Sequence, residues 1–263
     1  MSLNSPLIDW RNRRVWIIGA SSGIGAALAR ALLARGARVA VSARREEALA
    51  ALVERGGHAL VLPFDVNDAA KLAQAEQTLV ETWGGYDLVV YMAGDYTPMP
   101  VAEFNLARAQ ELLNTNLRGA LNALAVVLPR LLLARRGAIA LVASVAGYRG
   151  LPQSLVYGLT KAALINLSEA LYLELRPHGI EVFLINPGFV ATPLTAGNKF
   201  TMPALISAER AAAEIIRGFA HGRFEIHFPR RFTGWLKVLR LLHGANAQGI
   251  SALQRREFCQ ENI

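Results

Sequence analysis

Short apolar runs alternate with longer amphipathic stretches along this chain. Six runs have the length and apolar character of buried strands, at residues 15–18, 38–42, 59–63, 88–91, 138–143 and 180–185, and a seventh is expected at 224–228. Stretches with helical periodicity lie between them, at 24–35, 45–55, 67–83 and 154–176. This alternation predicts an α/β fold, in which a doubly wound parallel sheet of about seven strands carries helices on both faces.

The length and composition are consistent with that fold. A chain of 263 residues is long enough for one large domain, predicted over 1–263, and a hydrophobic content of 53% suits a sheet that is buried on both faces. The single cysteine, Cys259, excludes an intrachain disulfide and favours a reducing, cytoplasmic setting. The most apolar stretch, 121–133, contains Asn122, Pro129 and Arg130, so no membrane span is expected.

The chain carries a formal charge of +8, which favours anionic partners. Nucleic acid, an acidic membrane surface and a phosphorylated cofactor are the three candidates. The arginines occur as scattered pairs, such as Arg13-Arg14 and Arg255-Arg256, without a long basic run. We therefore expect mostly a solvated basic surface and no nucleic-acid partner, and the residues predict no metal site.

A glycine-rich turn follows the first predicted strand. The segment Gly19-Ala20-Ser21-Ser22-Gly23-Ile24-Gly25 joins that strand to a helix. Glycine at these three positions permits a tight turn and lets a pyrophosphate approach the backbone, and the helix N-terminus favours negative charge. The turn predicts dinucleotide binding on a Rossmann-type sheet; the alternative is a turn used only for packing.

The end of the second predicted strand indicates which dinucleotide is bound. An acidic residue there would hold the ribose 2′-hydroxyl of NAD, but the chain has Ala43 followed by Arg44. A guanidinium group suits a 2′-phosphate, so NADP(H) is favoured over NAD(H). Arg45 either assists or only starts the next helix.

Asp65 and Val66 follow the third predicted strand. The carboxylate of Asp65 has two interpretations: it accepts a hydrogen bond from the adenine amino group, or it caps the following helix. Asn67 is the more natural cap of that helix.

Tyr157 and Lys161 are four residues apart, and Ser144 lies upstream of them. On a helix, positions i and i+4 share one face, so the phenol and the ammonium point to one place. A nearby cation lowers the pKa of a phenol from about 10 and so allows it to exchange a proton with a substrate. A packed tyrosine beside a surface lysine is the alternative.

With these motifs the chain resembles the short-chain dehydrogenase/reductase (SDR) family, from about residue 13 to residue 228. The resemblance rests on motifs in the family's order: Gly19-x-x-x-Gly23-x-Gly25, Asp65-Val66, Ala93-Gly94, Asn116, Ser144, Tyr157-x-x-x-Lys161 and Asn186-Pro187-Gly188.

The resemblance implies a role for each of four catalytic residues. Tyr157 would be the general acid/base, and Lys161 would lower its pKa and bind the nicotinamide ribose. Ser144 would orient the substrate carbonyl, and Asn116 would hold a water that links Lys161 to solvent. The implied cofactor-binding residues are Gly19, Ser21, Ser22, Gly23, Ile24, Gly25, Arg44, Asp65, Val66, Ala93, Gly94, Tyr157, Lys161, Pro187, Gly188, Val190 and Thr192. Of these, the Val190 main chain and the Thr192 hydroxyl would bind the carboxamide.

Two positions depart from the family's pattern. Met92 stands where the family usually has an asparagine that ties the central strands together, so packing must compensate for it. Ser22 stands where many NADP-preferring members carry a base, so the NADP prediction depends on Arg44.

Two further segments bear on the substrate and on partners. Residues 193–207 correspond to the family's lid, in which Phe200, Met202, Leu205 and Ile206 would cover an apolar substrate, whereas Lys199 would attract an acidic one. The extension 229–263 contains a basic amphipathic stretch with Phe232, Trp235, Leu236, Leu239 and Leu242 on one predicted helix face. This stretch packs on a partner subunit or the substrate cleft, rests on an anionic membrane surface, or is a solvated helix.

The sequence therefore predicts an NADP(H)-dependent oxidoreductase acting on a carbonyl/alcohol pair, with a bulky, apolar substrate favoured. The resemblance implies a homodimer or homotetramer formed through helices near Asn116 and Tyr157. The alternative is a non-catalytic NADP-binding module whose basic surface engages a partner or nucleic acid.

Overall fold

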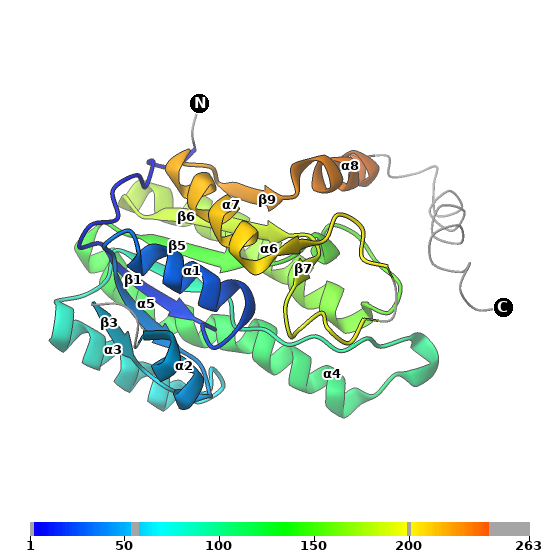
Figure 1. Cartoon of the computed structure of the whole chain (residues 1–263), viewed down its shortest axis with the longest axis horizontal. Helices are drawn as coiled ribbons and strands as arrows, with labels where there is room; N and C mark the ends of the chain where they lie inside the picture. The colour runs from blue at the N-terminus through cyan, green and yellow to red at the C-terminus, as the bar shows by residue number, and fades with distance from the viewer. Residues whose placement is uncertain (1–2, 54–57, 199–200, 242–263) are drawn as a thin grey trace.

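The centre of the molecule is a parallel sheet (Figure 1). The computed structural model describes residues 3–53, 58–198 and 201–241, except the side chains of 238–241. Within those ranges the sheet has seven strands, in the order β3-β2-β1-β4-β5-β6-β9, and every neighbouring pair is parallel. The strands are β1 (Arg14–Ile18), β2 (Arg38–Ser42), β3 (Ala59–Val61), β4 (Leu88–Tyr91), β5 (Ala138–Val142), β6 (Glu181–Pro187) and β9 (Glu225–Phe228). The predicted fold class and the seventh strand are confirmed.

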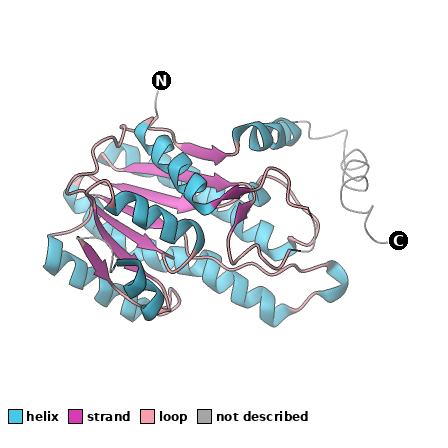
Figure 2. Cartoon of the chain, viewed as in Figure 1, coloured by secondary structure: helices cyan, strands magenta, loops and turns pink. Residues whose placement is uncertain are grey.

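Helices cover both faces of this sheet (Figure 2). One face packs against α1 (Gly23–Leu33), α2 (Glu46–Val53) and α7 (Ala208–Ala220). The other face packs against α3 (Ala69–Trp83), α5 (Gly119–Ala134) and α6 (Leu155–Leu175). The short elements are β7 (Val190–Ala191), β8 (Ile206–Ser207), α4 (Leu106–Leu113), η1 (Val101–Glu103), η2 (Asn114–Arg118), η3 (Val145–Gly147) and η4 (Arg176–His178). A last helix, α8 (Arg230–Leu241), follows β9.

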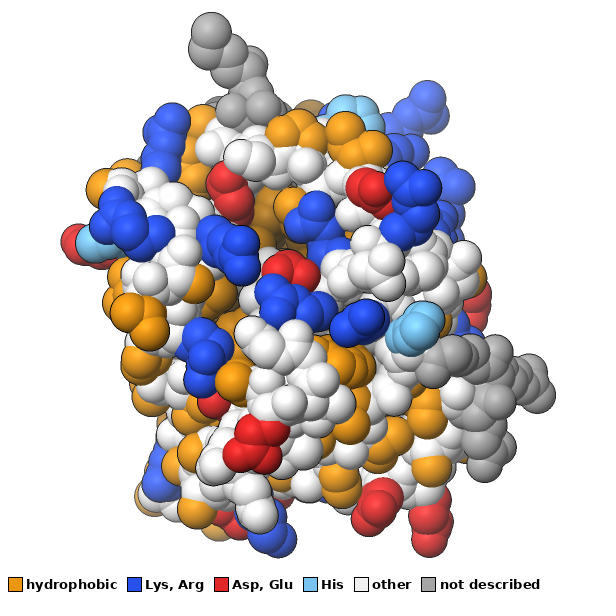
Figure 3. Space-filling model, turned by 90° about the vertical axis from the view of Figure 1, so that its left-hand side faces the viewer, with side chains coloured by type: hydrophobic (Ala, Val, Ile, Leu, Met, Phe, Trp, Pro, Cys, Tyr) orange, Lys and Arg blue, Asp and Glu red, His pale blue; other side chains and the backbone are white. Residues whose placement is uncertain are grey.

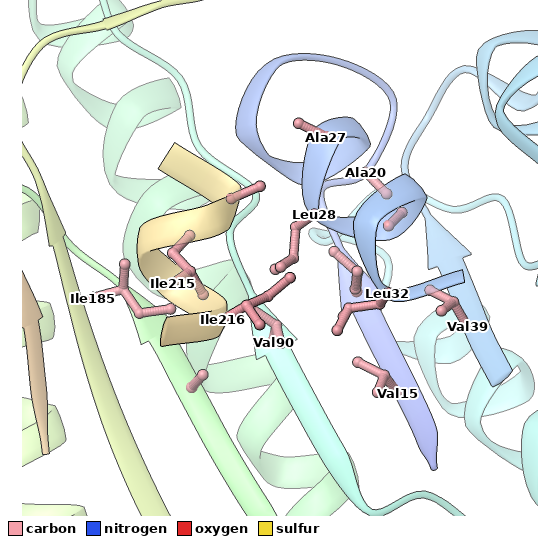
Figure 4. Packing of buried hydrophobic residues seen from close by; sticks show 14 of the residues in the cluster. Val15, Ala20, Ala27, Leu28, Leu32, Val39, Val90, Ile185, Ile215 and Ile216 are labelled. Carbon is pink, nitrogen blue, oxygen red and sulfur yellow. The ribbon is translucent and has the colours of Figure 1, made fainter. Parts of the chain in front are cut away.

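The two-sided cover explains why the strands read as continuous apolar runs. Side chains alternate between the two faces of a strand, and here both faces are buried. In β1, Val15 and Ile17 pack with α1 and α7, whereas Trp16 and Ile18 pack on the opposite side. Figure 4 shows the first of these layers, in which Leu28 and Leu32 of α1 and Ile215 and Ile216 of α7 lie over the strands.

The helical stretch from 106 to 134 is interrupted by the wide π-helical turn η2. The turn places Asn116 at its centre, and the phenol of Tyr91 donates a hydrogen bond of 2.7 Å to the carbonyl oxygen of Thr115. Wide turns of this kind are frequent at functional sites. By length and composition alone, Leu106–Ala134 is long and apolar enough to cross a membrane, and 33% of its most apolar window is buried. In this molecule the stretch packs on the sheet through Ala120, Ala123 and Leu124.

The basic side chains are mixed with acidic ones. Figure 3 shows the side of the molecule that lies at the left in Figure 1, where Lys and Arg side chains are spread among acidic and apolar groups. Several arginines are paired: Arg14 lies 2.6 Å from Asp87, and Arg130 lies 2.7 Å from Glu76. Positive charge is therefore spread over the face in Figure 3, and at Arg14 and Arg130 it is neutralised by a carboxylate.

Gly218 provides a test of the packing between α7 and β9. A Cβ atom at this position would lie 2.5 Å from Cγ1 of Ile226. Helix propensity alone favours alanine over glycine by about 1 kcal/mol. We nevertheless expect Gly218→Ala to lower the free energy of unfolding, by about 1–3 kcal/mol, because the added methyl overpacks the contact. Urea unfolding measures the change. A second substitution, Ile226→Ala, should make the double variant less destabilised than the sum of the two single changes; simple additivity would contradict the clash.

Candidate active site

A cleft of about 510 Å³ lies at the carboxyl ends of the strands. Its location follows from the strand order, because β1 pairs with β2 on one side and with β4 on the other. At this point the order of the strands in the sheet reverses, and ligands of open α/β sheets bind at such a switch point. The volume lies within the usual range for cofactor and ligand sites. All seventeen residues predicted to bind the cofactor line this cleft: Gly19, Ser21, Ser22, Gly23, Ile24, Gly25, Arg44, Asp65, Val66, Ala93, Gly94, Tyr157, Lys161, Pro187, Gly188, Val190 and Thr192.

The glycine turn forms a close backbone cradle at one end of the cleft. Gly19 has φ of +106°, and a Cβ atom there would lie 2.4 Å from the amide nitrogen of Ala93. A Cβ atom at Gly25 would lie 2.2 Å from the carbonyl oxygen of Gly19. The side chain of Ser22, the N-cap residue of α1, makes no capping hydrogen bond. This cradle fits a pyrophosphate held by backbone N–H groups at a helix N-terminus.

Two arginines lie at the outer edge of the same turn. Arg44 and Arg45 both line the cleft and are exposed, and Ala43 leaves the strand end without a carboxylate. Arg45 donates a hydrogen bond of 3.1 Å from Nη2 to the hydroxyl of Ser21. Arg45 therefore contacts the glycine turn, whereas the sequence had left its role undecided. This edge of the cleft has the positive charge that a 2′-phosphate requires.

The interpretation of Asn67 as the cap of α3 is wrong. Asp68 is the N-cap, and its carboxylate accepts a hydrogen bond of 3.0 Å from the amide of Lys71. Asn67 instead turns back to Asp65, whose Oδ1 accepts hydrogen bonds from its amide at 2.9 Å and from its side chain at 3.0 Å. Asp65 is thus held at the cleft rather than on the helix, and its contact with adenine stays a prediction.

Met92 is accommodated by packing, as its sequence position required. Its amide donates a hydrogen bond of 2.8 Å to the carbonyl oxygen of Ile18, which continues the pairing of β1 with β4. The side chain packs against the apolar layer between the sheet and helices α1, α2 and α7. A Cβ atom at Gly25 would lie 2.9 Å from its sulfur. The thioether therefore fills the space behind the glycine turn.

Tyr157, Lys161 and Ser144 come together at the other end of the cleft. Tyr157 and Lys161 lie one turn apart near the start of α6, and Ser144 follows β5. Ser144 and Tyr157 both line this end of the cleft, and the Ser144 hydroxyl acts on the pKa of the phenol. The ammonium of Lys161 lies 5.5 Å from the centre of the Tyr157 ring and donates a hydrogen bond of 3.0 Å to the carbonyl oxygen of Val142. Tyr157 and Lys161 therefore lie on the same face of α6, as their spacing predicted.

The pKa of Tyr157 is raised in this structure, whereas the sequence had predicted that it is lowered. Burial raises the pKa of Tyr157 to about 12; the hydrogen bond with Ser144 lowers it less, and Tyr96 raises it further. Burial also lowers the pKa of Lys161 to about 8. The ammonium lies over the ring and is directed at a backbone carbonyl, and burial therefore dominates the pKa of both groups.

Asn116 lies behind the cleft and does not line it. Its side chain is fully buried and bonds the backbone of Asp95 in both directions, with Oδ1 accepting from the amide at 2.7 Å and Nδ2 donating to the carbonyl at 2.9 Å. Nδ2 also contacts the hydroxyl of Thr160 at 3.1 Å, and that hydroxyl donates to the carbonyl oxygen of Tyr157 at 2.8 Å. Asn116 therefore connects the Asp95 loop to the first turns of α6; its role in holding a water stays a prediction.

Sequence reasoning missed several residues of the site. Thr160 and Tyr96 are the most important, because Thr160 completes the Asn116 chain and the Tyr96 ring stands edge-on to Tyr157 at 4.9 Å. Thr160 was detectable as a polar residue inside an apolar helix, and Tyr96 as an aromatic residue close after Ala93-Gly94. The cleft is also lined by residues that were not predicted to bind the cofactor or act in catalysis, namely Ala43, Arg45, Phe64, Met92, Asp95, Thr115, Val142, Ala143, Pro193, Leu194 and Thr195.

The predicted lid begins at the cleft and returns to the main domain. Leu194 and Thr195 line the cleft, and β7 pairs with β8. Leu194 is exposed, so this segment presents an apolar side chain at the site, and Leu205 is exposed further along the segment. Lys199 and Phe200 lie outside the described residues.

The extension after β9 packs against the same end of the molecule. Phe232 and Leu236 of α8 pack on the apolar layer between the sheet and helices α3, α5 and α6, whereas Trp235 is 61% exposed. Phe232 also lies 6.0 Å from the ring of Phe189, beside the Pro187-Gly188 segment of the cleft. Leu239 is among the side chains not described, and Leu242 lies beyond the described residues. Of the three readings of this stretch, packing near the cleft is the one these contacts support.

Comparison with known proteins gives a consistent result. The family model for short chain dehydrogenases matches residues 13–202. A protein described as an uncharacterized oxidoreductase from Myxococcus xanthus (strain DK1622) is 36% identical over 234 residues, covering 88% of this chain and 92% of that protein. The ketoacyl reductase HetN from Nostoc sp. (strain PCC 7120) is 32% identical over 211 residues, covering 78% of this chain and 74% of that protein. A crystal structure of a short chain dehydrogenase from Burkholderia cenocepacia J2315 in complex with NADP has a TM-score of 0.79 and 25% identity, and the match covers 95% of this chain and 99% of that chain.

The chain therefore belongs to the short-chain dehydrogenase/reductase family of oxidoreductases, as its motifs predicted. The family uses NAD(P). The cradle at Gly19 and Gly25 and the arginines at its edge fit such a cofactor.

The lowered pKa of Lys161 gives a test through stability. Below pH 8 both the folded and the unfolded chain keep the proton on this side chain, whereas between pH 8 and the ordinary pKa of about 10.5 only the unfolded chain keeps it. Stability rises with pH wherever the unfolded state binds more protons. We expect the free energy of unfolding of the wild type, minus that of Lys161→Met, to rise over this interval, by no more than about 3 kcal/mol.

Denaturant unfolding of both proteins at several pH values measures this difference. Subtracting the variant cancels the other titrating groups. A difference that is flat or falls between pH 8 and 10.5 would show that Lys161 is not held in an environment that disfavours its charge.

Proposed function

We propose that this chain is an NADP(H)-dependent oxidoreductase that reduces a carbonyl compound, or oxidises the matching alcohol, with Tyr157 exchanging the proton. The main support is the convergence of Tyr157, Ser144 and Lys161 at one end of a cleft whose other end is the glycine turn with Arg44. When bound, the cofactor supplies or accepts the hydride.

The protein groups would position the substrate and move one proton. The phenol of Tyr157 would donate its proton to the carbonyl oxygen, and the hydroxyl of Ser144 would donate a hydrogen bond to the same oxygen. Because burial raises its pKa, Tyr157 holds its proton at neutral pH, which is the form that reduction requires.

Lys161 and Asn116 would assist Tyr157. The ammonium of Lys161 is 4% exposed and lies beside the ring of Tyr157, so it would stabilise negative charge that develops on the phenol. Asn116 would hold the Asp95 loop and, through Thr160, the first turns of α6.

The substrate we propose is a bulky, fairly apolar carbonyl compound. Support comes from the exposed side chain of Leu194, which lines the cleft, and from the ring of Tyr96 against Tyr157. The relative named as a ketoacyl reductase makes a 3-oxoacyl thioester one member of this class to test. A screen of NADPH oxidation across ketones, quinones, steroids and acyl thioesters, repeated with NADH, would identify the substrate class.

Replacement of the phenol tests the proposed proton transfer. We expect Tyr157→Phe to bind NADPH within about twofold of the wild type, because the ring stays in place, but to lose about 10²- to 10⁴-fold in kcat. Tyr96→Phe is the matched control, since it removes a neighbouring phenol hydroxyl and keeps the ring contact. Stopped-flow fluorescence measures binding, and NADPH oxidation measures turnover; undiminished turnover in Tyr157→Phe would mean that another group donates the proton.

Replacement of Arg44 tests the cofactor preference. We expect Arg44→Ala to raise the Kd for NADPH by roughly 10-fold or more, which is the effect of removing a charge-assisted hydrogen bond, and to leave the Kd for NADH nearly unchanged. Arg45→Ala is the comparison, because its guanidinium contacts Ser21. Equal losses for the two dinucleotides in Arg44→Ala would remove the support for NADP(H).

We also propose that the chain forms a homodimer or homotetramer through α5 and α6. Large apolar side chains on these helices are exposed in the single chain: Leu121, Leu132, Leu133, Leu155, Leu159 and Leu173. Burying such side chains is the usual driving force for subunit association. Light scattering coupled to size-exclusion chromatography should give two or four times the chain mass, and a monomer at micromolar concentration would contradict this assembly.

A further inference from the structure

A carboxylate outside the lining of the cleft collects donors from three different elements. Oε2 of Glu225, in β9, accepts a hydrogen bond of 2.5 Å from Nζ of Lys237 in α8. Oε1 accepts one of 2.9 Å from Nδ2 of Asn186 in β6 and another from the phenol of Tyr148, just after η3. Glu225 thus joins the C-terminal helix to two segments that border the cleft.

The cluster is a tightly bound ionic group. Burial alone would raise the pKa of Glu225, but the hydrogen bonds from Lys237, Tyr148 and Asn186 outweigh it and hold the pKa below its ordinary value. The ammonium of Lys237 also lies 5.8 Å from the centre of the Tyr148 ring. Removing one partner would leave the partly buried charge of Glu225 with less compensation, so the members of the cluster depend on one another.

Tyr148 connects the cluster to the turn that carries Ser144. In this turn the hydroxyl of Ser144 accepts the amide of Ala146 at 3.1 Å, and the amides of Gly147 and Tyr148 bond the carbonyls of Ser144 and Val145 at 3.0 Å. Tyr148 is 6% exposed. A Cβ atom at Gly147 would lie 2.6 Å from the carbonyl carbon of Lys161, so the turn is packed against α6. A displacement of Tyr148 would therefore be transmitted to the hydroxyl of Ser144.

The helix at the other end of the cluster is anchored independently. Thr233 of α8 is fully buried, and its hydroxyl lies 2.6 Å from Nδ1 of His227 in β9. Phe232 packs beside Phe189, and a Cβ atom at Gly188 would lie 3.4 Å from the Phe232 ring. The helix is thus held at its first turn, and Lys237, about one turn further on, is its contact with Glu225.

We propose that Glu225 is a positioning residue of the active site and that α8, through Lys237, sets the conformation of the Ser144 turn. The catalytic consequence rests on the function proposed above, whereas the structural coupling does not. This gives the C-terminal helix a role in orienting the carbonyl of the substrate rather than in contacting it.

The test compares three variants of the full chain with a matched control. Lys237→Met removes the ammonium, Tyr148→Phe removes the phenol hydroxyl, and Lys237→Arg keeps the charge. The control is Arg231→Met, which removes an equal charge from an exposed position on the same helix. Thermal unfolding first establishes that each variant is folded.

The first readout needs no turnover. Hydrogen–deuterium exchange, followed by mass spectrometry, reports the amides of Ala146, Gly147 and Tyr148. We expect faster exchange there in Lys237→Met and Tyr148→Phe, and wild-type exchange in Lys237→Arg and Arg231→Met. Wild-type exchange at these amides in both Lys237→Met and Tyr148→Phe would overturn the coupling, whatever the protein catalyses.

The second readout is steady-state kinetics on the substrate found in the screen. We expect Lys237→Met and Tyr148→Phe each to lower kcat by about 10-fold or more, since a small misplacement of a catalytic group costs up to about 100-fold. The KM for NADPH should stay within about twofold, and the double variant should be no worse than the more impaired single one, because both act through one carboxylate. Wild-type kcat in both single variants would overturn the positioning role.

The two proposals fail in different ways. If the wild type does not turn over any carbonyl compound, or if Tyr157→Phe is fully active, the proposed function fails while the exchange experiment still decides the coupling. If the wild type is active and depends on Tyr157, but Lys237→Met and Tyr148→Phe lose only thermal stability, Glu225 is a structural residue and the further inference fails alone.

Discussion

Parallel pairing of every strand in the central sheet is the constraint on which the rest of the molecule depends. Parallel neighbours require a crossover between them, so each strand is followed by a helical connection and both faces of the sheet are buried. The same pairing brings all carboxyl ends to one edge. Where the winding reverses, between β1 and β4, the connections diverge and leave the cleft.

At that edge the structure holds polar groups in surroundings that oppose their charge. Lys161 is buried, and its ammonium bonds a backbone carbonyl and lies over an aromatic ring. Asn116 and Thr160 satisfy one another and fix the loop and the helix on either side. Burial of these groups costs stability unless each finds a partner, so the partners also determine where the side chains lie. The same reasoning applies to Glu225, whose partners come from three elements.

Sequence reasoning succeeded where a short stretch of chain carries its own signal. The strands were predictable because they are apolar over several residues, and the turn at Gly19 because glycine alone permits its backbone. Tyr157 and Lys161 were predicted to meet because helical spacing places them on one face. It failed at the cap of α3, where Asp68 and not Asn67 bonds the first turn, because both residue types make good caps. It also predicted a lowered pKa for Tyr157, whereas burial raises that pKa.

The sequence by itself determined the fold class, the family and the seventeen predicted cofactor-binding residues that line the cleft, because these depend on local periodicity and on motifs at set positions in the chain. Only the tertiary structure decided that Tyr96 faces Tyr157, that Arg45 contacts Ser21, and that α8 reaches the Ser144 turn through Glu225. These contacts join residues that are far apart in the chain or on separate elements. Their existence depends on how the helices pack on the sheet, and the spacing of residues along the chain carries no record of that packing.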